Sequence, residues 1–354
     1  MKSSGRWIFS LLLTGLILLC IPGGITVLID PYFHFHKPLS WLQYPIDNER
    51  YQNDGIVKHF DYDAVITGTS MTQNFRTSEL DELFGTHSVK VSFSGASLKE
   101  INDNLTVAVN HNPDIRLVVR GIDYNALMMP EDDMNYDEDK YPDYLYDDML
   151  YNDVEYIFNK DILFDATYRV LEYTSEGQTT TTFDEYGNWT SEHEFGRDAV
   201  DSGYPRGEKT DVITPITEED YAMIERNIGQ NVTGLAAQHP KIQFYLFFPP
   251  YSIYYWDSLY QSRMLERQLA AEKYTIELLL EYDNVHLFSF FTEYDMVCDL
   301  DNYMDNTHYG EDINSQILVW MSEGIHELTK ENYLEYCDEM YDFYMNYDYD
   351  ALFE

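Results

Sequence analysis

The longest apolar run of the chain lies close to its N-terminus. Residues Trp7–Ile29 include no charged side chain, and a helix needs roughly 20 apolar residues to cross a bilayer. Lys2 and Arg6 precede the run and Asp30 follows it, so the positive-inside bias places the N-terminus in the cytoplasm and the rest of the chain outside. A cleaved signal peptide is the alternative, but Ile21–Gly24 is a poor cleavage site. We therefore expect an uncleaved, single-pass anchor over residues 1–30, in the cell membrane, with an extracytoplasmic domain.

Beyond the anchor, short apolar runs of strand length alternate with stretches of helical periodicity. Residues 31–58 come first; they are rich in Pro, Tyr and His and are expected to form a stalk. The five predicted strands are Tyr62–Thr67, Ser88–Phe93, Ile115–Val119, Lys241–Phe248 and Val285–Phe290. The predicted helices are Glu79–Phe84, Leu98–Asn110, Glu218–Gln238, Asp257–Tyr282 and 311–328. This alternation predicts an α/β domain over residues 59–328, with a mostly parallel five-stranded sheet covered on both faces.

Residues 127–215 interrupt the alternation. They are acidic, rich in tyrosine and low in periodicity, with runs such as Glu131–Asp133 and Tyr136–Asp139. The stretch is too long for an ordinary connection, and its many aromatic residues argue against disorder. We expect an insertion with short helices of its own. An acidic tail, residues 329–354, is expected to form a helix packed on the surface.

Charge and cysteine content narrow the classes of function. The chain has 63 acidic and 22 basic residues, which gives a net charge of −41. Nucleic acid is therefore excluded as a partner, because its phosphates would be repelled. Outside the anchor only Cys298 and Cys337 remain, and the sequence leaves open whether they form a disulfide. No Cys/His cluster has zinc spacing and no acidic run has the full calcium-loop pattern, so no metal or other cofactor is expected.

The predicted topology brings several chemically active residues to one edge of the sheet. Right-handed crossovers place the carboxyl ends of parallel strands at the same edge, where ligands bind in such folds. Ser70 follows the first predicted strand and Gly95 follows the second, whereas Asp305 and His308 follow the fifth. A serine, a histidine and a carboxylate are the parts of a nucleophilic acyl-transfer site.

Each of these residues also has a purely structural interpretation. Ser70 could cap a helix, and His308 could be an ordinary histidine at a helix end. Asp305, however, stands three residues before His308 on the same predicted loop. We therefore interpret Ser70 as the nucleophile, His308 as its general base and Asp305 as the group that orients the imidazole ring.

A nucleophilic site of this kind also needs donors for the developing oxyanion. The backbone N–H groups of Ser70 and Gly95 are candidates, because a glycine lets the backbone approach a ligand closely. A side-chain amide would be the third donor, with Asn125 as the first candidate and Asn74 as the second. Tyr251 is expected to line the edge beside the base, and a packed loop without function is the alternative there.

These landmarks together resemble the SGNH (GDSL-like) hydrolase superfamily. That family has its serine after strand one, a glycine after strand two, an asparagine after strand three and Asp-x-x-His after the last strand. The positions that match are Ser70, Gly95, Asp305 and His308. The resemblance covers roughly residues 60–125 and 240–328. The chain departs from the pattern where Gly-Asp-Ser-Leu is Gly-Thr-Ser-Met, and where the asparagine of the third block is displaced to Asn125.

Within this superfamily the chain is similar to membrane-anchored bacterial members near the D-alanyl transfer protein of teichoic-acid operons and the alginate-type O-acetyltransferases. The resemblance implies a flavodoxin-like three-layer sandwich and a serine esterase or O-acyltransferase that works through an acyl-enzyme. The implied partners are a cell-surface glycan or acyl-ester substrate and a membrane-bound acyl-donor protein. The alternative is a non-catalytic surface protein on the same scaffold, which binds carbohydrate through the tyrosine-rich insertion.

Overall fold

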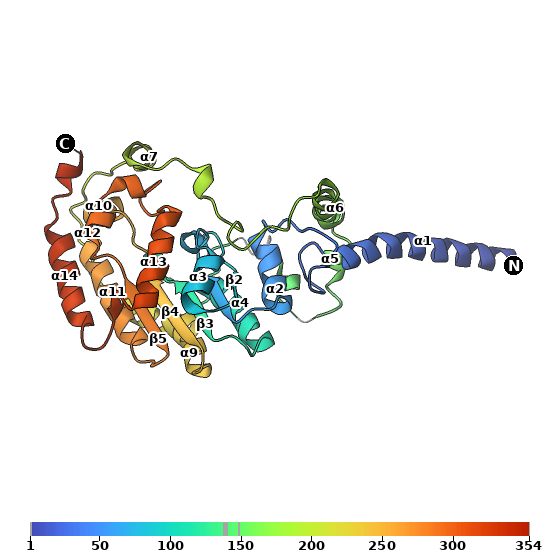
Figure 1. The fold of residues 1–354 in the computed structure, drawn as a ribbon, viewed down its shortest axis with the longest axis horizontal. Coiled ribbons are helices and arrows are strands. Elements are labelled where there is room, and N and C mark those ends of the chain that lie inside the picture. Colours follow the sequence, from blue (N-terminus) through green and yellow to red (C-terminus); the bar gives the residue numbers. More distant parts are fainter. Residues whose placement is uncertain (1, 137–140, 148, 354) are drawn as a thin grey trace. The chain divides into compact units, whose positions relative to one another are not determined.

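The computed structural model describes residues 2–136, 141–147 and 149–353 (Figure 1). The chain divides into two compact units: unit 1 is Met1–Phe60 with Asp139–Thr182, and unit 2 is Asp61–Glu138 with Phe183–Glu354. Residues 127–215, which the sequence predicts to be one insertion, are thus shared between both units. The acidic run at 136–139 and the last residue of the acidic tail extend outside the described residues.

Unit 1 is helical. Its α-helices are α1 (Lys2–Ile29), α2 (Glu49–His59), α5 (Val154–Ile157) and α6 (Thr167–Glu176), and a π-helical turn at Ile162–Ala166 leads into α6. Among the described residues, α1 is the one helix long and apolar enough to cross a membrane, with a mean hydropathy of 2.4 over an 18-residue window within Gly5–Ile29.

The end of α1 is fixed within unit 1 by a buried aspartate. Asp30 follows the helix directly, and its carboxylate accepts hydrogen bonds from the backbone N–H groups of residues 34–36. The same carboxylate accepts a hydrogen bond of 2.7 Å from the hydroxyl of Tyr156, a residue of α5. The segment expected to be a stalk is therefore packed against α1 and α5, and it contains α2.

Unit 2 is built on a six-stranded sheet with the order β2-β1-β3-β4-β5-β6 (Figure 1). The strands are β1 (Ala64–Thr67), β2 (Ser88–Lys90), β3 (Leu117–Gly121), β4 (Gln243–Phe248), β5 (Val285–Ser289) and β6 (Glu327–Leu328). The first five strands pair in parallel, and β6 pairs antiparallel with β5. Every residue of β1 and β3 is buried, as expected for central strands whose two faces are both covered. The predicted α/β class and the mostly parallel sheet are thus confirmed.

The predicted number of five strands is wrong, because β6 was hidden inside a predicted helix. Helix α13 (Glu311–Glu323) ends earlier than residue 328, at Gly324, whose φ of +69° is left-handed and suits glycine. The chain then turns back to pair Leu328 with Leu287. A strand of two residues is too short to show any alternation in the sequence.

The remaining helices of unit 2 flank the sheet. They are α3 (Thr77–Phe84), α4 (Leu98–His111), α7 (Arg197–Gly203), α8 (Glu218–Ile228), α9 (Gly234–Gln238), α10 (Ile253–Gln261), α11 (Leu265–Leu279), α12 (Tyr294–Val297) and α14 (Tyr333–Asn346). Helix α3 packs against α13, while α8 and α14 pack against α11. The single helix predicted at 257–282 is two helices, because Arg263 has a φ of +57° and breaks the run.

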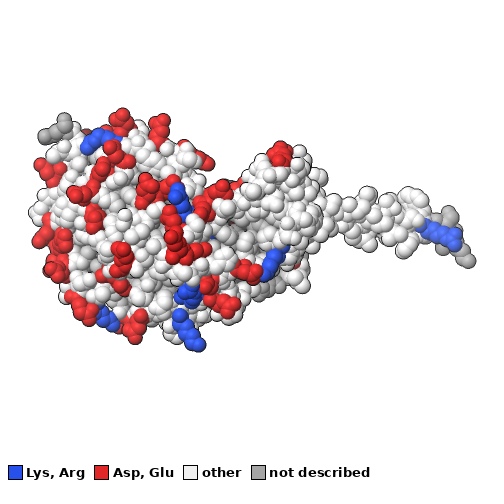
Figure 2. All heavy atoms as spheres, viewed as in Figure 1, with Lys and Arg blue, Asp and Glu red and all other residues white. Residues whose placement is uncertain are grey.

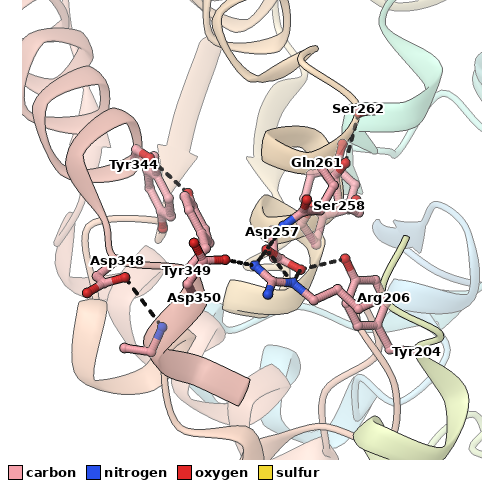
Figure 3. Close-up of polar contacts among 12 residues, drawn as sticks. Tyr204, Arg206, Asp257, Ser258, Gln261, Ser262, Tyr344, Asp348, Tyr349 and Asp350 are labelled. Atoms are coloured by element: carbon pink, nitrogen blue, oxygen red, sulfur yellow. Dashed lines mark hydrogen bonds and ion pairs between the residues drawn. The ribbon is translucent and has the colours of Figure 1, made fainter. Parts of the chain in front are cut away.

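The C-terminal tail is held to the body of unit 2 by polar contacts as well as by apolar packing. Helix α14 buries Tyr336, Met340 and Tyr344. Figure 3 shows that the guanidinium of Arg206 lies between Asp257 of α10 and Asp350 of the tail. Its Nη2 is 3.0 Å from Asp257 Oδ1 and 2.7 Å from Asp350 Oδ1 (Figure 3).

The acidic composition appears on the surface as scattered carboxylates. Figure 2 shows acidic side chains spread over the face in view, with few basic ones among them and no continuous basic patch on that face. Cys298 and Cys337 are both free thiols in the structure.

Candidate active site

The residues singled out in the sequence gather where the parallel strands end. Ser70 follows β1, Gly95 follows β2, Asn125 follows β3, Tyr251 follows β4 and His308 lies in the loop after β5. All five line one pocket of about 230 Å³. The pocket therefore lies at the carboxyl edge of the sheet, where α/β folds bind ligands.

A glycine turn places Ser70 at the pocket. Gly68 has a φ of +148°, and a Cβ there would lie 2.7 Å from Cγ2 of Thr72. Only glycine can therefore hold this turn without moving its neighbours. Ser70 then begins a 3₁₀ helix of three residues, Ser70–Thr72. A single turn of N–H groups is therefore what contributes positive potential at this serine.

Ser70, His308 and Asp305 form one line of hydrogen bonds. Ser70 Oγ lies 2.8 Å from Nε2 of His308, although the two residues are 238 positions apart in the chain. Nδ1 of His308 lies 2.8 Å from Oδ2 of Asp305. With the Nδ1 proton directed at the carboxylate, Nε2 is free to accept the proton of the serine hydroxyl.

The loop that carries this histidine is itself rigidly built. Oδ1 of Asp305 accepts hydrogen bonds from the backbone N–H groups of Thr307, at 2.8 Å, and of His308, at 2.7 Å, which closes a tight turn. The backbone N–H and the hydroxyl of Ser252 both donate to the carbonyl of Asn306, at 3.2 and 2.8 Å. The loop is thus tied to the segment after β4.

The same contacts keep Asp305 ionised. Burial raises the pKa of this carboxyl, but the hydrogen bond and positive charge of His308 and the two backbone N–H donors outweigh burial and lower the pKa to about 2. The carboxylate is therefore charged at neutral pH and can stabilise an imidazolium beside it.

Two of the candidate oxyanion donors, Gly95 and Asn125, lie at the pocket. Gly95 lines the pocket with a φ of +66°, and a Cβ there would meet nothing within 4 Å. Its backbone conformation, rather than crowding, thus favours glycine at this position. Asn125 is exposed at the pocket, and its Oδ1 accepts a hydrogen bond of 3.2 Å from the hydroxyl of Tyr255. This contact leaves its NH₂ group to serve as a donor.

Asn74 lies away from the pocket. It is buried, and its Oδ1 accepts a hydrogen bond of 3.1 Å from the backbone N–H of Trp189. It does not belong to the described residues that line the pocket. The structure therefore gives Asn74 a contact with a neighbouring segment. Of the two predicted amide candidates it leaves Asn125 at the pocket, which Asn135, a residue that the sequence did not single out, also lines.

A second carboxyl, Asp123, lies buried at the pocket. Thr69 Oγ1 donates to it at 2.8 Å, and the hydroxyl of Tyr251 donates to its other oxygen. The carboxylate of Asp123 thus holds two hydroxyl groups in place. Burial raises the pKa of Asp123, although both hydrogen bonds and the charge of His308 act in the opposite direction. Tyr251 thus lines the pocket with its hydroxyl already engaged.

Trp189 completes the surroundings of the serine and was missed in the sequence. Its indole Nε1 donates a hydrogen bond of 3.2 Å to the backbone carbonyl of Ser70. Its ring meets the ring of His308 edge-on, with the centroids 5.5 Å apart, and lies parallel to the ring of Phe195 at 6.3 Å. Trp189 is the single tryptophan between residues 127 and 215. This isolated position is the one feature of the sequence that could have indicated its role.

The segment that carries this tryptophan is fixed to unit 2 by several polar contacts. Oδ1 of Asp184 accepts a hydrogen bond of 3.0 Å from the backbone N–H of Ser78, at the start of α3. The amide of Asn188 donates to Glu311 of α13 at 2.9 Å. Residues 183–196 therefore belong structurally to the site and present a preorganised wall.

The two acids near the pocket are already occupied by protein partners. Asp123 is held by two hydroxyls, and Asp305 is held by the imidazole and two backbone N–H groups. Over the described ranges, no group of three or more His, Cys, Asp or Glu side chains is arranged to hold a metal ion.

Comparison of the sequence with protein-family models gave no match. Comparison with curated protein sequences gave none either.

Proposed function

We propose that this protein is a serine esterase or O-acyltransferase of the SGNH type, anchored in the membrane, that acts on acyl esters of cell-surface glycans. One observation carries the proposal: the hydroxyl of Ser70, the imidazole of His308 and the carboxylate of Asp305 are joined by two contacts of 2.8 Å each. This is the geometry of a nucleophile activated by an oriented general base.

In the proposed reaction, Ser70 Oγ attacks the carbonyl carbon of an acyl ester while its proton passes to Nε2 of His308. The tetrahedral intermediate collapses, the bond to the leaving alcohol breaks, and His308 returns the proton to the oxygen of that alcohol. The acyl group is now an ester of Ser70. Water or a sugar hydroxyl then attacks this ester with His308 again as the base, and Ser70 regains its proton.

The charge that develops on the carbonyl oxygen needs donors on the side of the pocket opposite the base. The backbone N–H groups of Ser70 and Gly95 and the amide of Asn125 are proposed for this role, since all three residues line the pocket. The left-handed φ of +66° at Gly95 supports its part in this proposal, because such a turn presents backbone N–H groups toward one point.

The sheet topology supports the resemblance to the SGNH superfamily. The order of the five parallel strands, β2-β1-β3-β4-β5, matches the strand order of flavodoxin-like folds, in which ligands bind at the switch point between β1 and β3. Ser70 follows β1, and Asp123 and Asn125 follow β3. The proposed nucleophile and its proposed amide donor therefore flank that switch point.

The size of the pocket and the aromatic side chains near Ser70 and His308 favour a small acyl group on a carbohydrate. A volume of about 230 Å³ is below the roughly 300–1,000 Å³ of pockets that enclose drug-sized ligands, so a short acyl chain fits better than a long one. Trp189 is partly exposed beside the serine and the histidine, and Phe195 is partly exposed beside Trp189. Flat aromatic faces suit the C–H faces of sugar rings, so these two residues are proposed to contact the glycan.

The anchor in this proposal is α1. Its uncharged stretch Trp7–Ile29 exceeds the roughly 20 residues that a bilayer requires. The positive charges before it and the aspartate after it favour an extracytoplasmic position for the remaining chain. A membrane-bound protein that supplies the acyl group is the expected partner for the transferase version of the reaction.

The proposal is tested with a small chromogenic acyl ester and a fluorophosphonate probe. Wild-type protein is expected to hydrolyse the ester and to be labelled covalently at Ser70, whereas Ser70→Ala should lose both properties. Ser322→Ala, which changes an exposed serine on α13, is the matched control and should behave as wild type. Equal turnover by Ser70→Ala would reject the assignment. Glycan binding without any labelling would favour the carbohydrate-binding alternative.

A further inference from the structure

Unit 1 exposes an unusual number of large apolar side chains in one segment. Leu150, Tyr151 and Phe164 are 84, 74 and 76% exposed. The whole set, which we name the apolar patch, is Met149, Leu150, Tyr151, Val154, Phe158, Phe164, Tyr168 and Leu171. Single exposed apolar residues are common, but a group of this size usually marks a binding surface or contact with a membrane.

The apolar patch is continuous with the surface of α1. Gly23 of α1 packs so closely against α5 that a Cβ there would lie 2.8 Å from Cγ2 of Ile157 and 3.3 Å from the ring of Phe158. An apolar cavity of about 550 Å³ lies between the two helices and is lined by Leu19 of α1 as well as by Phe158. The last turns of the spanning helix are thus continuous with the apolar patch at Phe158.

The contact lies at a depth along α1 that a bilayer would still surround. Gly23 precedes the end of the helix at Ile29 by six residues, or about 9 Å at the rise of an α-helix. Leu19 precedes that end by about 15 Å on the same scale. Helices that lie in a membrane interface bury their apolar face about 5–10 Å into the boundary between headgroups and acyl chains. The level of Gly23 agrees with this range.

The helical segment that follows α5, residues Ile162–Glu176, has one apolar and one polar side. A helix that lies in a membrane interface needs this pattern. Phe164, Tyr168 and Leu171 recur at spacings of four and three residues and are exposed on one side. Ala166 and Val170 lie on the opposite side and are buried within unit 1. The exposed apolar stripe therefore takes no part in the packing of this helix within unit 1.

We propose that the apolar patch seats unit 1 in the outer leaflet of the membrane that α1 crosses. Unit 1 would then be held at two places, by the spanning helix and by residues 149–171 at the interface. This inference rests on the proposed anchor role of α1. A lipid surface fits the patch better than a protein does, because the patch is continuous with a helix face that faces lipid. The exposed acidic residues Asp161, Asp165 and Glu172 favour zwitterionic over anionic headgroups.

The test uses the full chain in phosphatidylcholine liposomes. In a background where the three cysteines are replaced by serine, single cysteines are introduced at Leu150, Phe164 and Glu176 and labelled with an environment-sensitive fluorophore. Glu176 is exposed at the end of α6 and is the matched control outside the apolar stripe. A fourth label at Leu12 of α1 reports the anchor. Quenching of the labels at 150 and 164 by lipids with a shallow acyl-chain spin label is expected, together with no quenching at 176.

The outcomes separate this inference from the proposals on which it rests. Quenching at residue 12 without quenching at 150 and 164 would overturn the apolar patch as a membrane seat and leave the anchor intact. No quenching at residue 12 would overturn the anchor and the seat together. Shielding of 150 and 164 from aqueous iodide in native membranes, without quenching by lipid, would mean that a protein covers the patch and would also overturn the inference. Fluorophosphonate labelling of Ser70 in the same liposomes tests the chemistry independently.

Discussion

The indole N–H of Trp189 donates a hydrogen bond to the backbone carbonyl of Ser70 across 3.2 Å, and the same ring meets the imidazole of His308 edge-on. One aromatic side chain thus contacts both residues that form the serine–histidine hydrogen bond. It comes from a segment that shares no element with either residue. The contact suggests that Trp189 holds the serine turn in place and also offers a surface to the substrate.

The two roles of Trp189 can be separated by two substitutions. Trp189→Phe keeps an aromatic face and removes the N–H donor, so the serine turn loses one hydrogen bond worth about 1 kcal/mol. We expect ester hydrolysis to fall roughly 2- to 10-fold, the rate equivalent of such a loss. Trp189→Ala also removes the ring, and KM for a glycan ester should then rise while KM for a small synthetic ester changes little.

The control for these substitutions is Trp41→Phe, which alters an exposed tryptophan of unit 1 and should leave both KM values unchanged. Equal KM values for the glycan ester in wild type and Trp189→Ala would show that the ring does not contact the sugar. A fluorophosphonate labelling rate that is unchanged in Trp189→Phe would show that the hydrogen bond to Ser70 does not position the nucleophile.

A second prediction concerns Asp305. Asp305→Asn keeps the size of the side chain and removes the charge that orients the Nδ1 proton of His308. The ring can then adopt the wrong tautomer, and we expect kcat to fall about 10³- to 10⁴-fold, with a small change in KM. Asp312→Asn, on the exposed side of α13, is the control. A loss of less than 10-fold in Asp305→Asn would show that His308 does not depend on this carboxylate.

A third prediction uses the two acids that share Arg206 (Figure 3). Asp257 is fully buried and accepts hydrogen bonds from Arg206, Tyr204 and Gln261, whereas the side chain of Asp350 is 72% exposed. Asp257→Asn removes the buried carboxylate that holds Arg206, whose side chain is 22% exposed, and should lower the free energy of unfolding by about 2 kcal/mol, the value of hydrogen bonds to a charged group. Asp350→Asn removes a surface ion pair and should change it by no more than about 1 kcal/mol.

Urea unfolding of the full chain, followed by tryptophan fluorescence, measures the free energy of unfolding of wild type and of both variants. The two values compare the two carboxylates that bind Arg206. Similar effects for the two variants would mean that Arg206 is held mainly by the tail, and that the buried contact with α10 contributes little.

The sheet and the serine–histidine geometry could be anticipated from the sequence because both follow from short-range rules. Buried parallel strands are continuous apolar runs, and the carboxyl ends of such strands meet at one edge. Because Ser70 follows β1 and His308 follows β5, their positions in the sequence were enough to predict that they meet at this edge. The catalytic roles assigned to them stay predictions until turnover is measured.

The parts that the sequence did not reveal depend on contacts between distant residues. Strand β6 has two residues and exists because it pairs with β5. Trp189 reaches Ser70 because polar contacts made by Asp184 and Asn188 fix its segment. Neither feature has a periodicity that a sequence could show. Asn74 carries the same amide as Asn125, and only the folded chain shows which of the two lies at the pocket.

The last prediction concerns pH and a buried acid remote from the serine. Glu272 of α11 is 2% exposed and accepts a hydrogen bond of 2.6 Å from Tyr336 of α14. Burial raises its pKa to about 7, despite the hydrogen bonds of Tyr336 and Tyr124. An unfolded glutamate has a pKa of about 4.3, so between these two values the folded chain keeps a proton that the unfolded chain releases. The free energy of unfolding should therefore fall as pH rises from about 4 to 7, by on the order of 3 kcal/mol, and stay level above that range.

Glu272→Gln tests this directly, because an amide can accept the same hydrogen bond and does not ionise. The substituted side chain should contribute equally to stability at every pH. The free energy of unfolding of the variant should therefore match that of wild type near pH 4 and exceed it at pH 8. The control is Glu281→Gln, an exposed position just after the same helix, which should follow the wild-type curve. Unfolding by urea at pH 4, 6 and 8 gives the comparison. A Glu272→Gln curve that falls in parallel with wild type would assign the pH dependence to other groups and would contradict the raised pKa of Glu272.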